Sequence, residues 1–338
     1  MRRTENPKNR FEAQAVEWLS EPPYALLEVH EERAKSILSK NDSPDIGFRF
    51  SVNPYRGCYH GCAYCYARPS HQYWGFGAGT DFDRKIIVKV NAPELLRASF
   101  DDPNWTGEPI TFSGNTDCYQ PLEAAWRLTR GCLAVCAEYR NPVAIITKSA
   151  LVQRDLDVLC ELHAHARLRV YISIPFADDA KARIVEPGAS APSKRFAALE
   201  KLSSAGIETG VAIAPIIVGL NDSDIPELLA RAHAAGAKRS FKTALRLPAE
   251  VLPVFEGRLG QAFPDAAAKV MSSVVQIRRG KKNESAFGER MRGFGPRWDI
   301  VEDLYNVHRR RLGFVDDPES FFDLGTTFQR PHGQLALF

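Results

Sequence analysis

Three of the chain's seven cysteines lie within eight residues of one another: Cys58, Cys62 and Cys65. The segment that holds them reads NPYRGCYHGCAYCY over 53–66, so the spacing is C-x3-C-x2-C. Such a loop lets three thiolates converge on one face of an iron–sulfur cubane, and its two glycines relieve crowding. Three thiolates leave one iron without a protein ligand, whereas clusters that only transfer electrons normally have four cysteines. The spacing therefore favours a [4Fe–4S] cluster with one open coordination site.

The main alternative for this loop is a zinc site, with His60 or a distant cysteine as the fourth ligand. Zinc sites usually pair two closely spaced ligands with a second pair farther along, and no second pair is evident here. His60 stands between two of the cysteines and would have difficulty folding onto the same ion. A zinc or Fe–S protein that binds nucleic acid without catalysis is the outside alternative.

The composition is that of an ordinary globular chain, with 44% hydrophobic and 25% charged residues. The formal charge of +3 is too close to neutral to name a partner. No apolar run approaches the ~20 residues of a membrane-spanning helix, and residues 1–14 lack the apolar core of a signal peptide. An odd number of cysteines, three of them crowded together, argues against a secreted disulfide framework. We therefore expect a cytoplasmic protein with no membrane partner.

From Phe48 onward, short β-rich runs alternate with helical patterns, which is the βαβ rhythm of a parallel sheet. The expected strands are 48–52, 109–113, 143–147, 168–174, 210–217 and 239–244. The expected helices are 122–139, 151–163, 194–205 and 223–235, with an inserted strand at 85–90 and helix at 93–100. Periodicity alone leaves open whether the strands form part of a barrel or an open doubly wound sheet. In both, ligands bind at the carboxyl ends of the strands.

Three regions follow from this pattern. Residues 1–47 are expected to be an N-terminal extension, 48–247 the α/β core, and 248–338 a helical, basic C-terminal region. No internal repeat or low-complexity tract divides the chain further.

The cysteine loop follows the first expected strand directly, and Tyr64 precedes the third cysteine. In these respects it resembles the signature of the radical S-adenosylmethionine (SAM) superfamily. The resemblance covers about 48–247 and implies a partial TIM-like (βα)6 barrel. Residues 55–68 and 117–123, with the basic tail, are similar to an uncharacterised bacterial branch related to spore photoproduct lyase.

The resemblance implies roles for particular residues. Cys58, Cys62 and Cys65 would be the ligands of a [4Fe–4S] cluster whose open iron binds SAM. The loop SGNTD at 113–117 stands where the superfamily holds the amino group of SAM, although the common form there is Gly-Gly-Glu. The candidates for SAM contacts are Thr116 and Asp117 in this loop, then Ser173, Arg195, Gly219 and Tyr64.

Each candidate also has a plainer interpretation. Asp117 suits a helix N-cap, Ser173 a strand end bonded to the backbone, and Arg195 a solvated helix position. Gly219 suits a turn after a buried strand, and Tyr64 an ordinary packing position.

The resemblance further implies the reaction. A reduced cluster would cleave SAM, and the resulting 5′-deoxyadenosyl radical would abstract a hydrogen atom from the substrate. The implied partner is a one-electron reductant of the flavodoxin or ferredoxin type. Cys118 is a candidate hydrogen donor to a product radical, as a cysteine is in spore photoproduct lyase, but it is not a motif match and a small buried thiol is the alternative. Cys132, Cys136 and Cys160 are expected in the core.

The segment 276–311 contains ten Lys/Arg and five acidic residues, a net charge of +5. Phe287, Phe294 and Trp298 interleave with these charges, a composition that suits a phosphate backbone and stacked bases. The segment therefore suggests a nucleic acid or nucleotide as the substrate. A solvated helical tail explains the charges equally well, and the substrate is then a peptide or small molecule. The aromatic loop 71–76 is a further candidate to line or cap the active site.

Overall fold

The computed structural model describes residues 6–11, 25–315 and 321–331. Its main sheet has seven strands in the order β10-β9-β8-β7-β6-β3-β2. Six are parallel and follow chain order, as successive βαβ units produce, and β2 (Leu38–Lys40) pairs antiparallel with the first of them. The six are β3 (Phe50–Val52), β6 (Ile110–Phe112), β7 (Val143–Thr147), β8 (Leu168–Ser173), β9 (Glu208–Ile216) and β10 (Arg239–Ala244).

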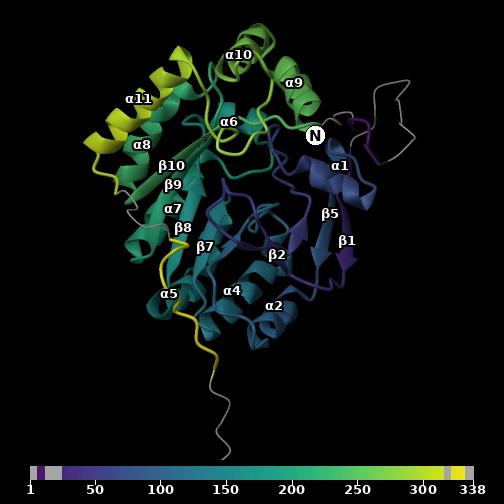
Figure 1. Ribbon diagram of the computed structural model, residues 1–338, viewed down its shortest axis with the longest axis vertical. Coiled ribbons are helices and arrows are strands. Elements are labelled where there is room, and N and C mark those ends of the chain that lie inside the picture. The colour runs from purple at the N-terminus through teal and green to yellow at the C-terminus, as the bar shows by residue number, and fades with distance from the viewer. Residues whose placement is uncertain (1–5, 12–24, 316–320, 332–338) are drawn as a thin grey trace, which may run out of the picture.

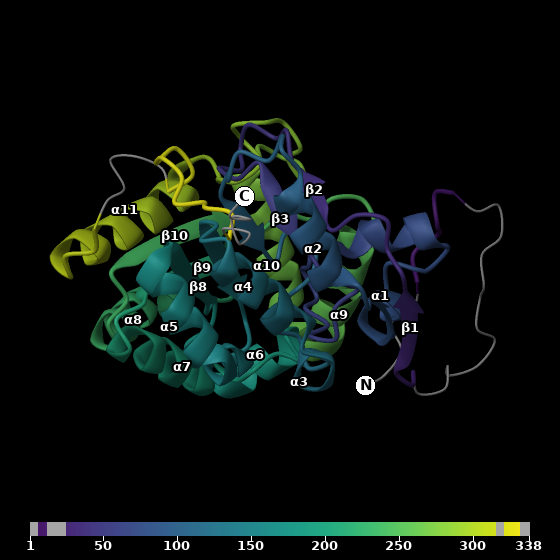
Figure 2. The same cartoon turned by 90° about the horizontal axis from the view of Figure 1, so that it is seen from below.

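Helices connect the parallel strands and cover one face of the sheet (Figures 1 and 2). Their apolar side chains form one large core with the strands. The connecting helices are α2 (Ala92–Asp101), α3 (Glu123–Trp126), α4 (Leu128–Glu138), α5 (Leu156–His165), α6 (Asp179–Val185), α7 (Pro192–Ser204) and α8 (Ile225–Ala234). The fold is thus α/β with a parallel sheet, as expected.

Side chains alternate between the two faces along each strand. On β8, Val170 and Ile172 belong to the helix-covered core, so Tyr171 points to the opposite face. On β10, Ser240 and Lys242 bond to α11 (Pro296–Arg311), so Phe241 also points to the opposite face. We term this opposite face, which includes Thr111, Ile146, Tyr171, Phe241 and Thr243, the inner face.

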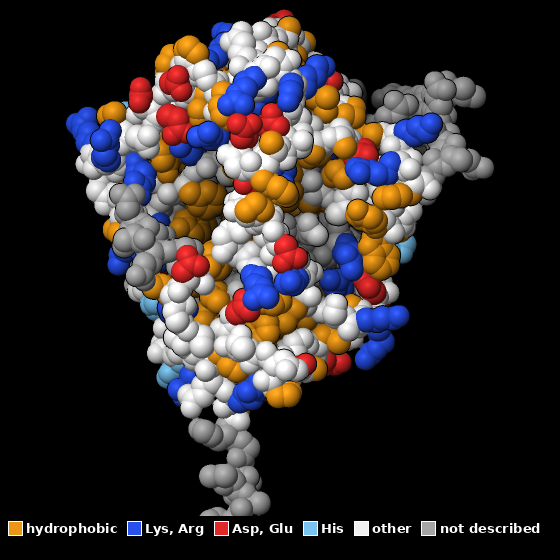
Figure 3. All heavy atoms as spheres, in the orientation of Figure 1, with side chains coloured by type: hydrophobic (Ala, Val, Ile, Leu, Met, Phe, Trp, Pro, Cys, Tyr) orange, Lys and Arg blue, Asp and Glu red, His pale blue; other side chains and the backbone are white. Residues whose placement is uncertain are grey.

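The inner face is partly open to solvent. Ile146, Tyr171, Phe241 and Thr243 are all partly exposed. The rings of Tyr171 and Phe241 meet edge to face, with centroids 5.0 Å apart. Gly210 makes room for this pair, because a Cβ atom there would lie 2.4 Å from the Tyr171 ring. The space-filling view is hollowed over β9 and β10, where hydrophobic side chains line the depression (Figure 3).

A smaller sheet carries the cysteine loop. It has the order β1-β5-β4, formed by β1 (Glu28–Glu32), β5 (Lys85–Lys89) and β4 (Tyr55–Arg56). β4 leads directly into the loop, which η1 (Arg68–Trp74) and α1 (Thr80–Arg84) follow. Residues before 48 therefore contribute strands to both sheets, which the expected extension did not include.

The C-terminal region contains α9 (Val251–Ala262), α10 (Pro264–Ile277) and α11. α9 and α10 share an apolar cluster with Phe176, Ile217 and Leu245, which follow β8, β9 and β10, whereas α11 packs against α8. Residues 279–295, which we term the basic loop, are not helical. They are fixed to the strand end by hydrogen bonds from Ala244 N to Met291 O at 2.9 Å and from Leu247 N to Asn283 Oδ1 at 3.0 Å. In the described part of the chain, no helix has the length and apolarity to cross a membrane.

The six expected strands and the inserted one are confirmed, with ends shifted by up to two residues. The expectation of one helix over 122–139 is wrong, because Arg127 adopts φ 54° and separates α3 from α4. The reason is local: the Glu123 carboxylate accepts hydrogen bonds from the backbone N–H groups of Thr129 and Arg130. These groups begin α4, so the acid caps the new helix. The region boundaries at 47 and 247 remain predictions.

Candidate active site

The cysteine loop is a compact, buried turn held by its own backbone. Gly61 N donates to Cys58 O at 3.1 Å, and Cys65 N donates to Cys62 O at 3.2 Å. Cys58 N donates to Phe82 O at 2.9 Å, which fixes the loop to α1. Cys58 and Cys62 are buried, and Cys65 packs against the apolar groups around both of them. The three sulfur-bearing residues therefore share one small region of the fold.

Burial favours the protonated, neutral form of two thiols of this loop, Cys62 and Cys65. Burial and, to a smaller extent, the neighbouring Cys58 raise the pKa of Cys65 to about 11. Burial and Glu186 likewise raise the pKa of Cys62. Metal binding requires thiolates, so binding would release protons. Among the described residues, no three His, Cys, Asp or Glu side chains are grouped as ligands of a single metal ion.

Buried cations surround this loop and fit a bound anionic cluster. Arg68 is fully buried and donates to Cys62 O through Nε at 3.1 Å and Nη2 at 2.7 Å. Its charge acts against the burial-induced rise in the pKa of Cys65, as does that of Lys148. A thiolate-bound cluster would compensate the cationic surroundings, so the residues present fit a [4Fe–4S] group.

His60 links the cysteine loop to the loop after β6. Its Nδ1 atom lies 3.4 Å from Oδ2 of Asp117. Burial alone would lower the pKa of His60, but Asp117 and Cys58 raise it to about 10. Burial alone would raise the pKa of Asp117, but His60, the Lys148 N–H group and the Thr147 hydroxyl hold it at about 2. Thr147 Oγ1 donates at 2.6 Å and Lys148 N at 2.7 Å, and Tyr119 N donates to the same carboxylate at 2.9 Å.

These contacts occupy the Asp117 carboxylate within the protein. Its bond from Tyr119 N closes a local turn, whereas the N-cap of α3 is Leu122, so the interpretation of Asp117 as a helix N-cap is wrong. Thr116 also serves the cysteine loop, since its Oγ1 donates to Gly57 O at 2.5 Å. The predicted SAM contacts in 113–117 thus lie beside the cysteine loop, at the carboxyl end of β6. Their role toward SAM stays a prediction.

The predicted SAM contacts Tyr64 and Arg195 meet at the buried carboxylate of Glu186. Glu186 accepts hydrogen bonds from the Tyr64 hydroxyl and from Arg195, which is fully buried. Arg195 also donates to Ser173 O at 2.9 Å. Ser173 lies at the end of β8 on the inner face, and its Oγ donates to Ala214 O at 3.3 Å. Arg195 is therefore enclosed by protein groups and is not the solvated arginine of the plainer interpretation.

Gly219 has φ 87°, a left-handed conformation that favours glycine. A Cβ atom there would lie 3.3 Å from Ser273 Oγ of α10, so this turn packs against the C-terminal region.

Cys118 is fully buried in the main core. Cys132 and Cys136 are core residues as expected, and Cys160 packs against the same core.

The basic segment divides into structural and exposed residues. Arg278 is buried and donates to Leu245 O and Arg292 O, and Trp298 is also buried. Phe294 lies under Arg279, whose guanidinium is 3.6 Å from the ring centroid. Phe287 is 61% exposed in the basic loop. Arg309–Arg311 end α11, as expected of cations that complement the helix dipole.

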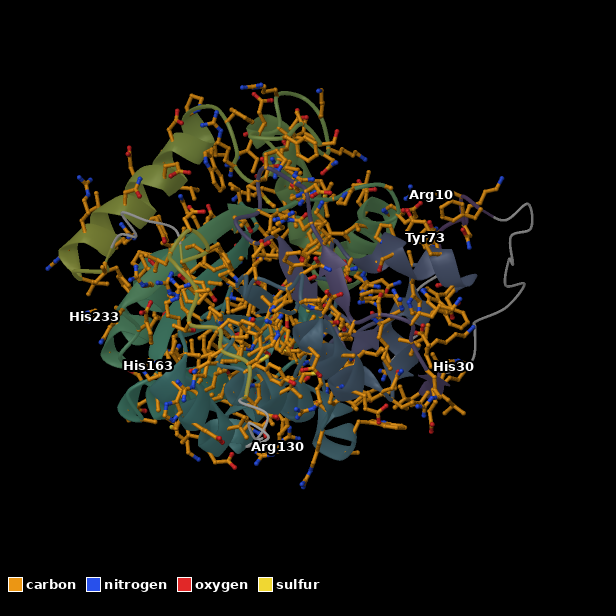
Figure 4. The ribbon with its side chains drawn as sticks, turned by 60° about the horizontal axis from the view of Figure 1, so that its bottom comes forward. Arg10, His30, Tyr73, Arg130, His163 and His233 are labelled. Atoms are coloured by element: carbon orange, nitrogen blue, oxygen red, sulfur yellow. The ribbon has the colours of Figure 1, made fainter. Side chains whose placement is uncertain are left out.

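The aromatic loop 71–76 is placed away from the inner face. Tyr73 is 75% exposed and its ring lies tilted against that of Phe11, with centroids 5.2 Å apart. Figure 4 shows Tyr73 beside Arg10 at the edge of the molecule. His71, by contrast, is buried against Phe82 behind the cysteine loop.

Sequence reasoning missed most of the residues that support the cysteine loop. Arg68 stands three positions after Cys65, close enough in sequence to have been considered with the motif. Asp83 and Arg258 complete a buried network with Arg68, yet they stand far from the motif and carry no spacing signal. Glu186 carries no spacing signal either, because its bond to Tyr64 joins residues 122 positions apart.

Comparison with known proteins agrees with this geometry. The family model of the radical SAM superfamily matches residues 52–232. An uncharacterised protein of Mycobacterium tuberculosis is 34% identical over 251 residues, which cover 73% of this chain and 74% of the relative. An uncharacterised protein of Methanocaldococcus jannaschii is 30% identical over 196 residues, 58% of this chain and 70% of the relative.

Solved structures of spore photoproduct lyase have a similar fold. The lyase complexed with dinucleoside spore photoproduct aligns with a TM-score of 0.58 at 16% identity, covering 84% of this chain and 79% of the lyase. A mutant with bound AdoMet and dinucleoside spore photoproduct also has a TM-score of 0.58, at 19% identity, covering 85% and 79%. The family match spans more than half of the chain, and its members bind a [4Fe–4S] cluster and SAM. The chain therefore belongs to the radical SAM superfamily.

Proposed function

We propose that this protein is a radical SAM enzyme whose substrate is a nucleic acid or a nucleotide. The observation that carries the substrate class is the position of the basic loop, which is fixed to the carboxyl end of β10 beside the open part of the inner face. When bound, the cluster and SAM supply a 5′-deoxyadenosyl radical that takes a hydrogen atom from the substrate.

The basic loop has the chemistry of a nucleic-acid contact. Lys281 and Lys282 have side chains that are 66% and 51% exposed, and Arg292 is exposed as well. Phe287 presents an exposed ring beside Arg290, whose guanidinium is 4.6 Å from the ring centroid. Cations interleaved with an exposed ring suit a phosphate backbone with unstacked bases.

The inner face supplies a site for the reacting base. Tyr171 and Phe241 expose parts of their rings on the inner face, next to each other. Parallel sheets bind ligands at the carboxyl ends of their strands, and Phe241 is on β10, three residues before its end at Ala244. A planar base stacked here would have the basic loop beside its phosphates. The similar fold of a lyase complexed with a dinucleoside photoproduct supports this class.

In this proposal Cys58, Cys62 and Cys65 hold the cluster. Thr116, Asp117 and Ser173 orient SAM, directly or through the loops that they fix, while Tyr64, Arg195 and Gly219 shape the surrounding walls. Cys118 is kept as the candidate hydrogen donor to a product radical, although its thiol is fully buried. The reductant is a one-electron donor of the flavodoxin or ferredoxin type.

The test is anaerobic reconstitution with iron and sulfide, reduction with dithionite, and assay of 5′-deoxyadenosine formed from SAM. The matched control is the Cys58→Ala, Cys62→Ala, Cys65→Ala variant. Formation by the wild type alone supports the radical SAM activity, and zinc in place of iron would contradict it. A modified nucleotide formed from single-stranded oligonucleotides supports the substrate class. Peptide or small-molecule products without any nucleotide product would replace it with the alternative.

A further inference from the structure

A buried network of three charged residues connects α9 with the cysteine loop. Asp83 is fully buried and accepts hydrogen bonds from two arginines, one on each carboxylate oxygen. Arg68 Nη2 is 2.9 Å from Oδ1, and Arg258 Nη2 binds Oδ2. Arg258 stands on α9, 175 positions from Asp83.

Both arginines also hold the backbone of the cysteine loop. Arg68 donates to Cys62 O, and Arg258 Nη1 donates to Gly61 O, so two adjacent carbonyl groups are fixed by two guanidinium groups. The planar fork of Arg258 serves Gly61 and Asp83 at the same time, which the single ammonium of a lysine does not reproduce. The neighbouring residues Phe255 and Leu259 of α9 pack in the same apolar cluster as Cys62.

The network brings two positively charged guanidinium groups and one carboxylate against the cysteine loop. The Arg258 side chain is only 10% exposed, and the other two are fully buried. A buried guanidinium group is stabilised by negative charge close to it. The three thiolates would give a bound cluster a net negative charge, and each electron added to the cluster would increase that charge. A nearby cation therefore favours the reduced cluster.

We infer that Arg258 is a positioning residue of the iron–sulfur site: it holds the Gly61–Cys62 segment in its ligating conformation, and its charge raises the reduction potential of the cluster. The C-terminal helix α9 is then part of the cluster site and not only an addition to the superfamily fold. The inference rests on the proposed function, because it takes Cys58, Cys62 and Cys65 as the ligands.

The test is a redox titration of the reconstituted full-length protein, in which the paramagnetic reduced cluster is followed by EPR. Arg258→Met is compared with the wild type and with Arg231→Gln, a control on α8 whose guanidinium bonds to Glu227 and Ala177 O. At a fixed potential near the wild-type midpoint, the Arg258→Met variant is expected to show about a tenfold lower ratio of reduced to oxidised cluster. This ratio corresponds to a midpoint about 59 mV lower for a one-electron couple.

A second variant, which is expected to shift the midpoint in the opposite direction, keeps the inference testable if Arg258→Met does not fold. Asp83→Asn removes the negative charge and keeps both arginines, so its midpoint is expected to rise. An Arg258→Met protein with wild-type melting behaviour that binds no iron also supports the positioning role. If the Arg258→Met protein assembles a cluster whose midpoint equals that of the wild type, the inference is overturned. If the Arg258→Met protein does not fold, an Asp83→Asn midpoint equal to that of the wild type overturns the inference instead. A wild-type protein that assembles no reducible cluster instead overturns the proposed function.

Discussion

The imidazole of His60 lies 3.4 Å from the carboxylate of Asp117, and both side chains are almost completely buried. His60 stands between two of the predicted cluster ligands, while Asp117 follows β6. The pair therefore joins the cysteine loop to the strand end at which a SAM contact is predicted. Asp117 also accepts hydrogen bonds from Tyr119 N, Thr147 Oγ1 and Lys148 N. One carboxylate therefore connects the cysteine loop, the loop after β6 and the end of β7.

Asp117→Asn is expected to destabilise the protein. The substitution leaves His60 buried without its anionic partner, and breaking a buried pair costs about 3 kcal/mol. Denaturant unfolding measures the change in the free energy of unfolding. The control is Asp265→Asn at an exposed position in the first turn of α10, which should change stability by less than about 0.5 kcal/mol. Equal stability of the two variants would mean that the His60–Asp117 pair contributes nothing.

Cys132→Ala and Cys136→Ala, made together, are expected to leave the iron and sulfide content unchanged. Both thiols are buried in the main core, away from the cysteine loop, and their loss should cost about 1–2 kcal/mol as a small cavity. By contrast, alanine at Cys58, Cys62 or Cys65 should abolish cluster assembly. Iron and sulfide analysis of each purified variant checks this, and loss of iron from the core variant would point to a second metal site.

Acid is expected to destabilise the protein partly through His71. Burial lowers the pKa of His71 to about 4, below its ordinary 6.5. The unfolded chain therefore binds more protons between these values, so stability falls as pH drops from 6.5 to 4, by about 2–3 kcal/mol.

The variant His71→Phe keeps the contacts with neighbouring rings and should show a flatter pH dependence in this window. His163→Gln is the control, since His163 is exposed on α5 (Figure 4). Unfolding curves for the three proteins at matched pH values are compared. A wild-type slope in His71→Phe would assign the acid sensitivity to other groups.

Lys281→Gln with Lys282→Gln is expected to weaken binding to single-stranded DNA and to reduce its salt dependence. Each phosphate contact contributes about 0.7 to the slope of log K against log salt for single strands, so two lost contacts lower the slope by about 1–1.5. Fluorescence anisotropy at several salt concentrations measures it. Lys194→Gln with Lys201→Gln, on exposed positions of α7, is the matched control. Identical slopes for both pairs would argue against contact by the basic loop.

Tyr171→Ala is expected to weaken oligonucleotide binding about tenfold with little effect on the salt slope. Stacking of a base on an aromatic ring is worth about 1–3 kcal/mol and does not depend on counterion release. The control is Tyr73→Ala, which replaces an exposed ring at the edge of the molecule and should leave the affinity unchanged. An unaffected Tyr171→Ala affinity would remove the inner face as the base site.

The sequence by itself determined the features that depend on local spacing. The three cysteines act within eight residues, so their spacing sufficed to predict the cluster and, by resemblance, the superfamily. The strands were found because β-branched runs have a strong local preference and alternate with helical periods. The break at Arg127 was missed because it depends on a carboxylate that caps the following helix, which the apolar pattern does not register.

Tertiary structure decided which charges and rings meet. Arg258 reaches the cysteine loop from 197 positions away, and Arg195 pairs with Glu186 where the sequence suggested a solvated or ligand-binding arginine. Tyr171 and Phe241 form their pair only because β8 and β10 flank Gly210 on the same face. Packing between distant segments decides which charged groups are buried, and burial decides the strength of their electrostatic interactions. For this reason the sequence predicted the cluster ligands but not the residues that hold them.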